Sequence, residues 1–310
     1  MEMRQALCEC LDEMMAENEN IVVIDADLAK PNGTFPLRKK YPERAIDVGI
    51  AEQNMASVAA GMSSYGFIPC ITSFTPFASR RICDQIAISI AYAKQNVKII
   101  GSDPGISAEF NGGTHMSMED IGVLRSIPEL VIYGPVDVAQ FKQALPQIVA
   151  YEGPVYIRMF RKTIDDVFTD ANYKFDLFGA DCIQEGTAVT IFCSGSMVQE
   201  TMKANEILKQ ECIDAEIINI HTIKPIDRDA VVASAKKTGA VVVAENHNVI
   251  GGLTSAVCEV LMEEYPVPLR AVGVKDRFGQ VGKMPFLKEE YHMTAKDIVS
   301  AVKEVIRLNK

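Results

Sequence analysis

The sequence has no long apolar run and no cluster of basic residues, and each absence excludes a class of function. No apolar stretch in the 310 residues approaches the roughly 20 that a membrane-spanning helix needs. The first residues alternate charged and apolar side chains at helical spacing, without the continuous apolar core of a signal peptide. The formal net charge is -10, and no run of Lys and Arg supplies the clustered positive charge that nucleic-acid phosphates require. We therefore expect no export, no membrane insertion and no nucleic-acid partner, although an anionic small molecule could still bind locally.

Paired metal-ligand spacing is also missing from the eight cysteines, which are scattered and mostly lie inside apolar runs. They are Cys8, Cys10, Cys70, Cys83, Cys182, Cys193, Cys212 and Cys258. A chain of this size and apolar content has no need of a disulfide framework to hold its core. Reduced, buried thiols and a cytoplasmic location are therefore expected.

What the sequence does contain is an ordinary globular composition, with 48% apolar and 23% charged residues and enough length for two domains. Short β-branched runs alternate with helical patterns through residues 1–161 and again through residues 187–310. Alternation of this kind predicts parallel sheets covered by helices. Residues 162–186 break the pattern with scattered aromatics and the turn-like TDANYKFD, which favours a linker. The expected fold is α/β, with two tandem domains, each a mostly parallel sheet with helices on both faces.

The expected elements follow from apolar periodicity and from the positions of turn residues. In the first domain we expect a strand beginning near residue 21 and further strands over 46–48, 67–74, 97–103, 129–137 and 154–160. Helices are expected over 3–17, 76–92 and 136–149 and beginning at residues 52 and 117. Loops are expected over 30–41 and 103–115. In the second domain we expect strands over 188–195, 215–221, 240–246 and 268–274, helices over 197–210, 227–237, 252–262 and 294–308, and a turn over 222–227.

The stretch 46–62, IDVGIAEQNMASVAAGM, is the one around which the first domain is organised. A short buried strand ends near Val48, Gly49 allows a tight exit, and a helix of small residues begins at Glu52. Such junctions lie outside the carboxyl ends of parallel strands, where open α/β sheets bind ligands. The simpler interpretation is that Glu52 only complements the positive end of a helix dipole.

Five side chains share this kind of position in the first domain, at or just after the carboxyl ends of expected strands. They are Asp27, Glu52, Phe74, Phe77 and His115. In a parallel sheet these ends meet at one edge, so the five residues form a candidate site. Taken singly, the phenylalanines could be core residues and the histidine a surface residue. The joint placement is what favours a site.

The motifs GIAEQNM, SFTPF, GGTH and GPVYIRMFR, in this order and spacing, resemble the pyrimidine-binding domain of the transketolase family. Residues 185–310, with IKPID and with VAENH followed by Gly251 and Gly252, resemble the C-terminal domain of the same family. The resemblance covers nearly the whole chain. The sequence looks like the C-terminal half of a transketolase made as a separate polypeptide.

The resemblance implies a thiamine diphosphate cofactor and assigns residues to it. The cofactor works through carbon C2 of its thiazolium ring, and its own 4′-amino group removes the C2 proton with the help of a carboxyl group bound to N1′. Glu52 matches that carboxyl group, and a surrounding of aromatic rings favours the protonated form that such a bond needs. The other cofactor positions implied are those of Asp27, Leu28, Ile50, Phe74, Phe77 and Arg80.

The resemblance also implies a substrate site. His115 matches the histidine that contacts the transferred two-carbon fragment, and Arg161 matches an arginine that grips a distal phosphate, for which a guanidinium is suited. A linker-side surface charge is the alternative for Arg161. The sequence departs from the family at Asn111, where an aspartate is usual, and at Asp103, where a phosphate-binding histidine is usual. A carboxylate there repels a dianion, so a ketose other than the common sugar phosphates is indicated.

The family motif that binds Mg²⁺ and the diphosphate, GDG followed by an Asn, is not in this sequence. The resemblance therefore implies a partner subunit with the N-terminal half of a transketolase, which carries the metal ligands, in an assembly of two copies of each chain. The function expected is transfer of a two-carbon ketol unit from a ketose to an aldose, by the two chains together. Two alternatives stay open: the beta subunit of a 2-oxo-acid dehydrogenase, and a non-catalytic paralogue that only binds a partner.

Overall fold

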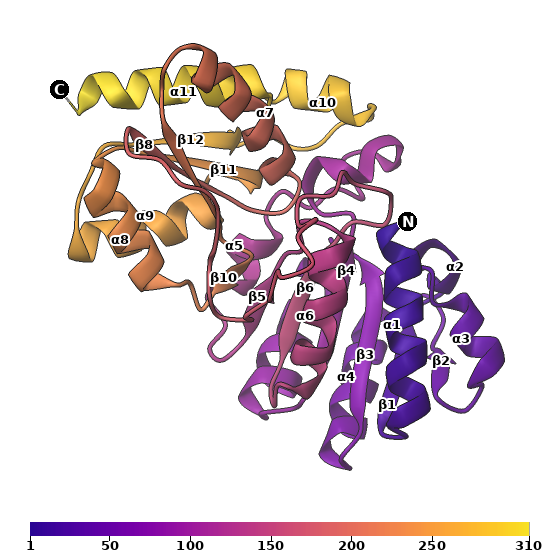
Figure 1. The fold of residues 1–310 in the computed structure, drawn as a ribbon. Coiled ribbons are helices and arrows are strands. Elements are labelled where there is room, and N and C mark those ends of the chain that lie inside the picture. The colour runs from indigo at the N-terminus through magenta and orange to yellow at the C-terminus, as the bar shows by residue number, and fades with distance from the viewer. Residues whose placement is uncertain (310) are drawn as a thin grey trace.

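The computed structural model describes residues 1–309 and contains two sheets, one in each half of the chain (Figure 1). The first has the strand order β10-β5-β6-β4-β3-β1-β2. Its strands are β1 Ile21–Asp25, β2 Ala45–Asp47, β3 Ile68–Phe74, β4 Lys98–Ser102, β5 Val131–Tyr133, β6 Val155–Met159 and β10 Thr222–Lys224. All neighbours pair in parallel except β10, which runs antiparallel to β5.

The second sheet has the strand order β12-β11-β8-β9-β7. Its strands are β7 Asp181–Gln184, β8 Val189–Cys193, β9 Ala215–Asn219, β11 Val241–Asn248 and β12 Leu269–Val274. Only β7, at one edge, is antiparallel to its neighbour. Both sheets are therefore mostly parallel, as the sequence predicts.

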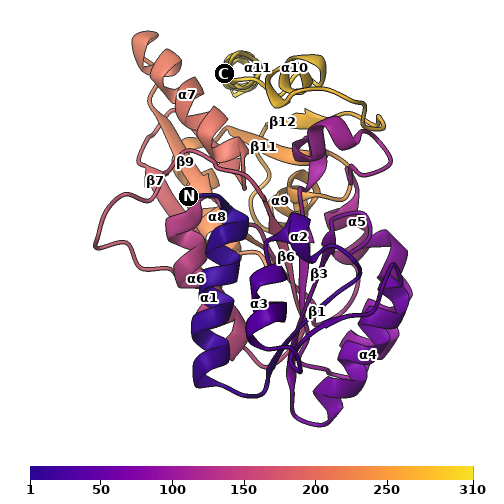
Figure 2. The same cartoon turned by 90° about the vertical axis from the view of Figure 1, so that its right-hand side faces the viewer.

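Helices cover both faces of each sheet, which confirms the α/β fold. In the first domain α1 Met3–Glu17 and α6 Val138–Ala150 pack on one face, and α4 Glu52–Ser64 packs on the other (Figure 2). In the second domain α7 Met197–Gln210 and α11 Ala295–Leu308 cover one face, and α8 Arg228–Thr238 and α9 Leu253–Glu264 cover the other. Two further short helices, α5 Asp120–Leu124 and α10 Met284–Glu290, lie at the junction of the domains.

The strands are apolar on both sides because both faces are buried. In β1, Ile21 and Val23 pack in the core that holds α1 and α6, and Val22 and Ile24 pack in the core that holds α4. This alternation explains why the sequence shows a continuous β-branched run there. None of the helices formed by residues 1–309 combines the length and the apolar character needed to cross a bilayer.

The chain crosses between the two sheets where we expected a turn. Thr222 pairs with Tyr133 and Lys224 with Ile132, so β10 extends the first sheet although it lies between two strands of the second. Conversely, β7 lies inside the segment 162–186 and belongs to the second sheet. The division of the chain at residues 161 and 187 stays a prediction.

Three local predictions were wrong in detail. The expected loop over 30–41 contains two short helices, α2 Ala29–Asn32 and α3 Phe35–Lys40, which begin with a proline in their first turn, where its missing N–H is tolerated. The segment 76–92 is a 3₁₀-helix, Arg80–Ile82, followed by a π-helix, Gln85–Tyr92, in place of one α-helix. The loop after β4 contains a 3₁₀ segment, Gly105–Asn111.

Candidate active site

The carboxyl ends of the parallel strands β1, β2, β3, β4 and β6 lie at one edge of the first sheet. The chain leaving each of these ends carries a residue singled out in the sequence. They are Asp27 after β1, Glu52 after β2, Phe77 after β3, Asp103 after β4 and Arg161 after β6. The topology therefore places them at the edge where α/β sheets bind ligands.

Glu52 is the first residue of α4 and is only 4% exposed. Its Oε1 accepts a hydrogen bond from Arg81 Nη1 at 2.6 Å. The Arg81 guanidinium also lies over the Phe77 ring, with Cζ 3.8 Å from the ring centroid. The carboxylate thus has a counter-ion and an aromatic neighbour, in addition to the helix N-terminus that the simpler interpretation gives it.

Sequence reasoning named Arg80 for this site and missed Arg81. Arg80 instead forms an ion pair with Glu119, with 2.5 Å between Nη1 and Oε1. The two arginines are adjacent, and the 3₁₀ conformation of residues 80–82 changes which side chain faces Glu52. The resemblance to the family implies Arg80 for this position, and it gives no indication of the 3₁₀ turn that brings Arg81 to Glu52.

Three rings form a cluster, and Arg81 links one of them, Phe77, to Glu52. The Phe74 and Phe77 centroids are 6.2 Å apart, and the His115 ring lies edge-on to both, at 6.0 and 5.3 Å. All three residues are half-buried, so the phenylalanines are not part of the core. His115 Nδ1 is 2.8 Å from the Thr114 hydroxyl oxygen, which orients the imidazole. The cluster has apolar faces and one titratable ring.

Asp103 and Arg161 form a tight pair on the other side of Phe74. Asp103 is 3% exposed and its Oδ2 accepts hydrogen bonds from both Nε and Nη2 of Arg161 at 2.5 Å. Its Oδ1 accepts the Arg161 backbone N–H at 3.0 Å. The Arg161 Cζ lies 4.6 Å from the Phe74 ring centroid. Arg161 is therefore held beside the aromatic cluster by Asp103, whose carboxylate the sequence analysis expected to face the substrate.

The remaining expected residues lie at the open side of this edge. Asp27 and Asn111 are exposed, Leu28 is half-buried, and Ile50 is 77% exposed. The Asp27 backbone, at a φ of 61°, donates its N–H to Asp47 Oδ1 at 3.0 Å. Their side chains do not close the pocket around Glu52 from this subunit.

A second carboxylate, Asp25, shapes this open loop and was not singled out in the sequence. It is 3% exposed, binds Arg38 Nη2 through both oxygens at 3.0 and 2.9 Å, and accepts the N–H groups of Leu28 and Ala29. Burial raises its pKa, against the effect of Arg38. Asp25 thus fixes the turn that presents Asp27 and Leu28.

One group of side chains within residues 1–309 is close enough together to ligate a metal ion. It consists of Cys182, Glu185 and Glu216 in the second domain, away from the edge described above. The Lys237 ammonium already pairs with both of these carboxylates. The Lys237 ammonium therefore already supplies the positive charge that a metal ion would bring to this group.

Comparison with known proteins assigns both halves of the chain. Residues 1–165 match the model of the transketolase pyrimidine-binding domain, and residues 179–298 match that of the transketolase C-terminal domain. The chain belongs to the transketolase family. It corresponds to the C-terminal half of these thiamine-diphosphate-dependent enzymes.

Relatives that are themselves subunits match this transketolase chain over nearly its full length. It is 52% identical over 303 residues to a 6-deoxy-6-sulfo-D-fructose transketolase subunit of Clostridium sp. (strain MSTE9), covering 98% of this chain and 94% of that one. It is 30% identical to an apulose-4-phosphate transketolase subunit of Phocaeicola vulgatus, covering 98% and 97%. A solved structure described as a split gene transketolase, inactive beta4 tetramer, superposes with a TM-score of 0.91 at 41% identity and covers 100% and 99%. The chain is thus a subunit of the split type of transketolase.

Proposed function

We propose that this chain is the pyrimidine-binding subunit of a two-chain transketolase that transfers a two-carbon ketol unit from an anionic ketose to an aldose. The observation that carries the proposal is the buried carboxylate of Glu52, which Arg81 links to the half-buried ring of Phe77. The names of the split relatives support a two-chain transketolase.

The residues fit the aminopyrimidine end of thiamine diphosphate. Arg81 provides the test, because its flat, nitrogen-bearing guanidinium already makes both contacts that the aminopyrimidine needs, a hydrogen bond to Glu52 and a stack on Phe77. When bound, the cofactor supplies a nucleophilic carbon that accepts the ketol unit. Glu52 would hold a proton at the ring nitrogen N1′, and Phe77 and Phe74 would hold the ring plane.

Arg81 has a specific consequence for Glu52. The Arg81 guanidinium already donates to Glu52 Oε1 at 2.6 Å, and the ring nitrogen N1′ would need the same carboxyl group. We infer that Arg81 gives up its contact with Glu52 when the pyrimidine ring enters. The Arg81 side chain is 42% exposed, so it has solvent to move into.

The donor we propose is a ketose with a singly charged terminal group, such as a sulfonate. Arg161 is the anion ligand, and two of its nitrogens are already bound to the buried Asp103. Because the Arg161–Asp103 pair is close to neutral, it attracts a dianion much less strongly than a free arginine would. A monoanion is repelled by Asp103 less than a dianion is. The 52% identical relative acts on a sulfonated ketose, which supports this choice. His115, beside both phenylalanines, would contact the transferred fragment.

The partner we propose is a separate chain with the N-terminal half of a transketolase, which supplies the ligands of Mg²⁺ and the diphosphate. Two copies of each chain would form the enzyme. The solved relative described as an inactive beta4 tetramer supports the view that this kind of chain does not act alone. All eight cysteines are free thiols, which supports a cytoplasmic location.

The experiment that tests the proposal is a ketol-transfer assay with a panel of ketoses, Mg²⁺ and thiamine diphosphate. We expect no turnover with this chain alone and turnover after addition of the candidate partner encoded beside it. Release of CO₂ from a 2-oxo acid by the mixture would identify a 2-oxo-acid dehydrogenase subunit instead. A stable complex that turns over neither substrate class would identify a non-catalytic paralogue.

A further inference from the structure

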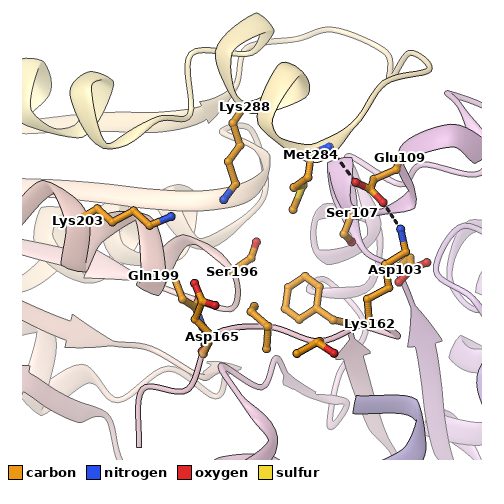
Figure 3. A pocket seen from close by; sticks show the side chains of 13 residues that line it. Asp103, Ser107, Glu109, Lys162, Asp165, Ser196, Gln199, Lys203, Met284 and Lys288 are labelled. Atoms are coloured by element: carbon orange, nitrogen blue, oxygen red, sulfur yellow. Dashed lines mark hydrogen bonds and ion pairs between the residues drawn. The ribbon is translucent and has the colours of Figure 1, made fainter. Parts of the chain in front are cut away.

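A cavity of about 240 Å³ is lined by residues of both halves of the chain (Figure 3). Glu52, Phe74, Phe77 and His115 are not among its lining residues. Phe160 and Ser107 line it from the first domain, and Ser196, Gln199 and Lys288 line it from the second. Its volume is below the roughly 300 Å³ at which pockets for drug-sized ligands begin, so it suits a small metabolite. Nothing in the proposed ketol transfer uses the second-domain side of this cavity.

The cavity lies at the switch point of the second sheet. From β8 the chain passes through α7 to β9 on one side, and from the adjacent β11 it passes through α9 to β12 on the other side. Ligands of open α/β sheets bind in the crevice that such a reversal creates at the carboxyl ends of the strands. Here α7, a helix of 14 residues, begins directly after that crevice at Met197.

Two buried polar side chains at the start of α7 each carry an oxygen atom that has no hydrogen-bond partner within the described residues. Ser196 is 4% exposed, and its hydroxyl has no hydrogen bond and is turned toward the side of the cavity where Lys288 lies (Figure 3). Gln199 is 7% exposed and donates its amide N–H groups to the carbonyl oxygens of Val136 and Asp165, at 3.0 and 2.9 Å. That leaves Gln199 Oε1 without a donor. Buried polar groups are normally paired, so both atoms indicate a missing ligand.

The charges around the start of α7 favour an anion. The ammonium groups of Lys288 and Lys203 both bind one carboxylate, that of Glu200, at 2.7 and 3.1 Å. Two positive charges therefore share one negative charge, next to the positive end of a helix dipole. Figure 3 shows both ammonium groups directed to this side of the cavity.

Three other carboxylates face the cavity and have to be accounted for. Asp103 is held by Arg161, and Glu109 is held by Lys162 and by the Met284 N–H. Asp165 has no ion-pair partner in the described part of the chain but is exposed, where water and salt screen its charge. The positive charge on the α7 side is therefore the one that a buried ligand meets.

We propose that this cavity binds a small hydroxylated oxyanion, that is, a phosphate, sulfonate or carboxylate group on a polyol. The oxyanion lies at the start of α7 against the Ser196 hydroxyl and Lys288, and a ligand hydroxyl donates to Gln199 Oε1. The positive end of the α7 dipole lies beside the same oxygens and favours their negative charge. Such a ligand has two possible sources, a free effector or the far end of the sugar substrate, and only the second source rests on the proposed ketol transfer.

The first test measures binding of inorganic phosphate to the full chain alone by isothermal titration calorimetry. We expect saturable binding that weakens about tenfold in Lys288→Met and about threefold in Ser196→Ala, which removes one hydroxyl donor. Asp165→Asn removes a facing charge and should tighten binding about threefold. Lys203 still neutralises Glu200 in Lys288→Met, so the fold is kept.

Two control variants separate this site from others. Lys303→Met removes a lysine that pairs with Glu211 away from the cavity. The double variant Asp103→Asn/Arg161→Met removes the anion ligand of the substrate site together with its counter-charge, so no uncompensated carboxylate faces the cavity. Both should bind phosphate as the unaltered chain does. Absence of saturable binding, an affinity in Lys288→Met and Ser196→Ala equal to that of the unaltered chain, or loss of binding in the Asp103→Asn/Arg161→Met double variant would overturn the proposal.

The second test identifies the source of the ligand in the assembled two-chain enzyme. If the cavity holds the end of the sugar, phosphate competes with an anionic ketose, and Lys288→Met raises KM for that ketose but not for a neutral one. If it holds an effector, phosphate changes the rate without competing, and Lys288→Met abolishes this change. Failure of ketol transfer would leave the calorimetric result intact, so the two proposals fail independently.

Discussion

Arg158 and Arg161 lie three residues apart at the end of β6, and each is bound by an aspartate, yet the two pairs differ in what else surrounds them. Asp120 takes Arg158 Nε and Nη2 at 2.6 and 3.0 Å and also accepts the Tyr156 hydroxyl at 3.0 Å. The Arg158 side chain is 6% exposed and that of Asp120 is fully buried. Arg158 Nη2 also donates to the carbonyl oxygen of Asn246 in the second domain, at 3.2 Å.

The other pair, Asp103 and Arg161, borders the Phe74 ring and the cavity at the start of α7. The pair of Asp120 and Arg158 borders only other protein groups. The pair of Asp120 and Arg158 links the two domains, because the Arg158 guanidinium donates both to Asp120 and to the Asn246 carbonyl oxygen. The pair of Asp103 and Arg161, in contrast, can still interact electrostatically with a ligand. The same two residue types thus serve the fold in one place and the site in the other.

The largest effect is expected from breaking the closed pair. Asp120→Asn leaves the Arg158 guanidinium buried without a counter-charge, and such a loss destabilises proteins by about 3–5 kcal/mol. The free energy of unfolding in urea measures it. As the control, Asp12→Asn breaks the exposed pair with Lys40 and should change stability by less than about 1 kcal/mol. Similar small changes in both variants would show that Asp120 does not hold the domains together.

In the open site the expected loss is in turnover. Glu52→Gln keeps the shape of the side chain but cannot hold the proton, so kcat of the two-chain enzyme should fall about 10²–10⁴-fold. Stability should stay within about 1 kcal/mol, as for most substitutions that leave no cavity. Glu263→Gln, an exposed glutamate paired with Arg228, is the matched control. Unchanged turnover in Glu52→Gln would remove the proposed mechanism.

Removing the charge of the open pair should change specificity. Asp103→Asn keeps an oxygen to accept from Arg161 but leaves the guanidinium charge uncompensated. We expect kcat/KM for a phosphorylated ketose to rise about tenfold relative to a sulfonated one, because a dianion gains more than a monoanion from the lost repulsion. The sulfonated ketose serves as the internal reference. An unaltered ratio would show that Asp103 does not face the substrate.

A smaller effect is expected at Arg81, which occupies the place proposed for the pyrimidine ring. Arg81→Ala removes this competitor, so thiamine diphosphate should bind the two-chain enzyme about three- to tenfold more tightly, a gain of the size of one exposed ion pair. Isothermal titration calorimetry with Mg²⁺ present measures the Kd. Weaker binding would mean that Arg81 itself holds the cofactor.

Asp181 differs from Asp120 and Asp103 because it is a half-buried aspartate whose partners are neutral side chains and not an arginine. It accepts hydrogen bonds from Gln140, Tyr173 and Asn219. Burial raises its pKa from 3.8 to about 6. In Asp120 burial also acts to raise the pKa, but Arg158, His247 and the Tyr156 hydroxyl together outweigh it and lower the pKa. Between pH 3.8 and about 6, the folded chain therefore binds a proton at Asp181 that the unfolded chain has lost.

This shift has a defined sign in the stability curve. A carboxyl group with a raised pKa contributes stability below pH 3.8, and that contribution is lost as the pH rises through about 6. Asp181→Asn should flatten the dependence of the unfolding free energy on pH between these values. Identical pH profiles for the two proteins would show that Asp181 is ionised throughout.

Much of the fold and part of the site were predictable from the sequence for a local reason. Strands buried on both faces require continuous apolar runs, so β1, β3, β4, β6, β8 and β11 are visible as short β-branched segments. Glu52, Phe74 and Phe77 follow such segments within a few residues. Since parallel strands share an edge, the sequence by itself determined that these side chains come together.

Only the tertiary structure decided what these residues contact. The pairing of Asp103 with Arg161 spans 58 positions, and the strand β10 leaves its own domain to join the first sheet. Arg81 faces Glu52 in place of Arg80 because a 3₁₀ turn sets the phase of the segment. The cavity at the start of α7 forms between residues of two domains. None of these contacts leaves a periodic signal in the chain, because each depends on how distant segments pack against one another.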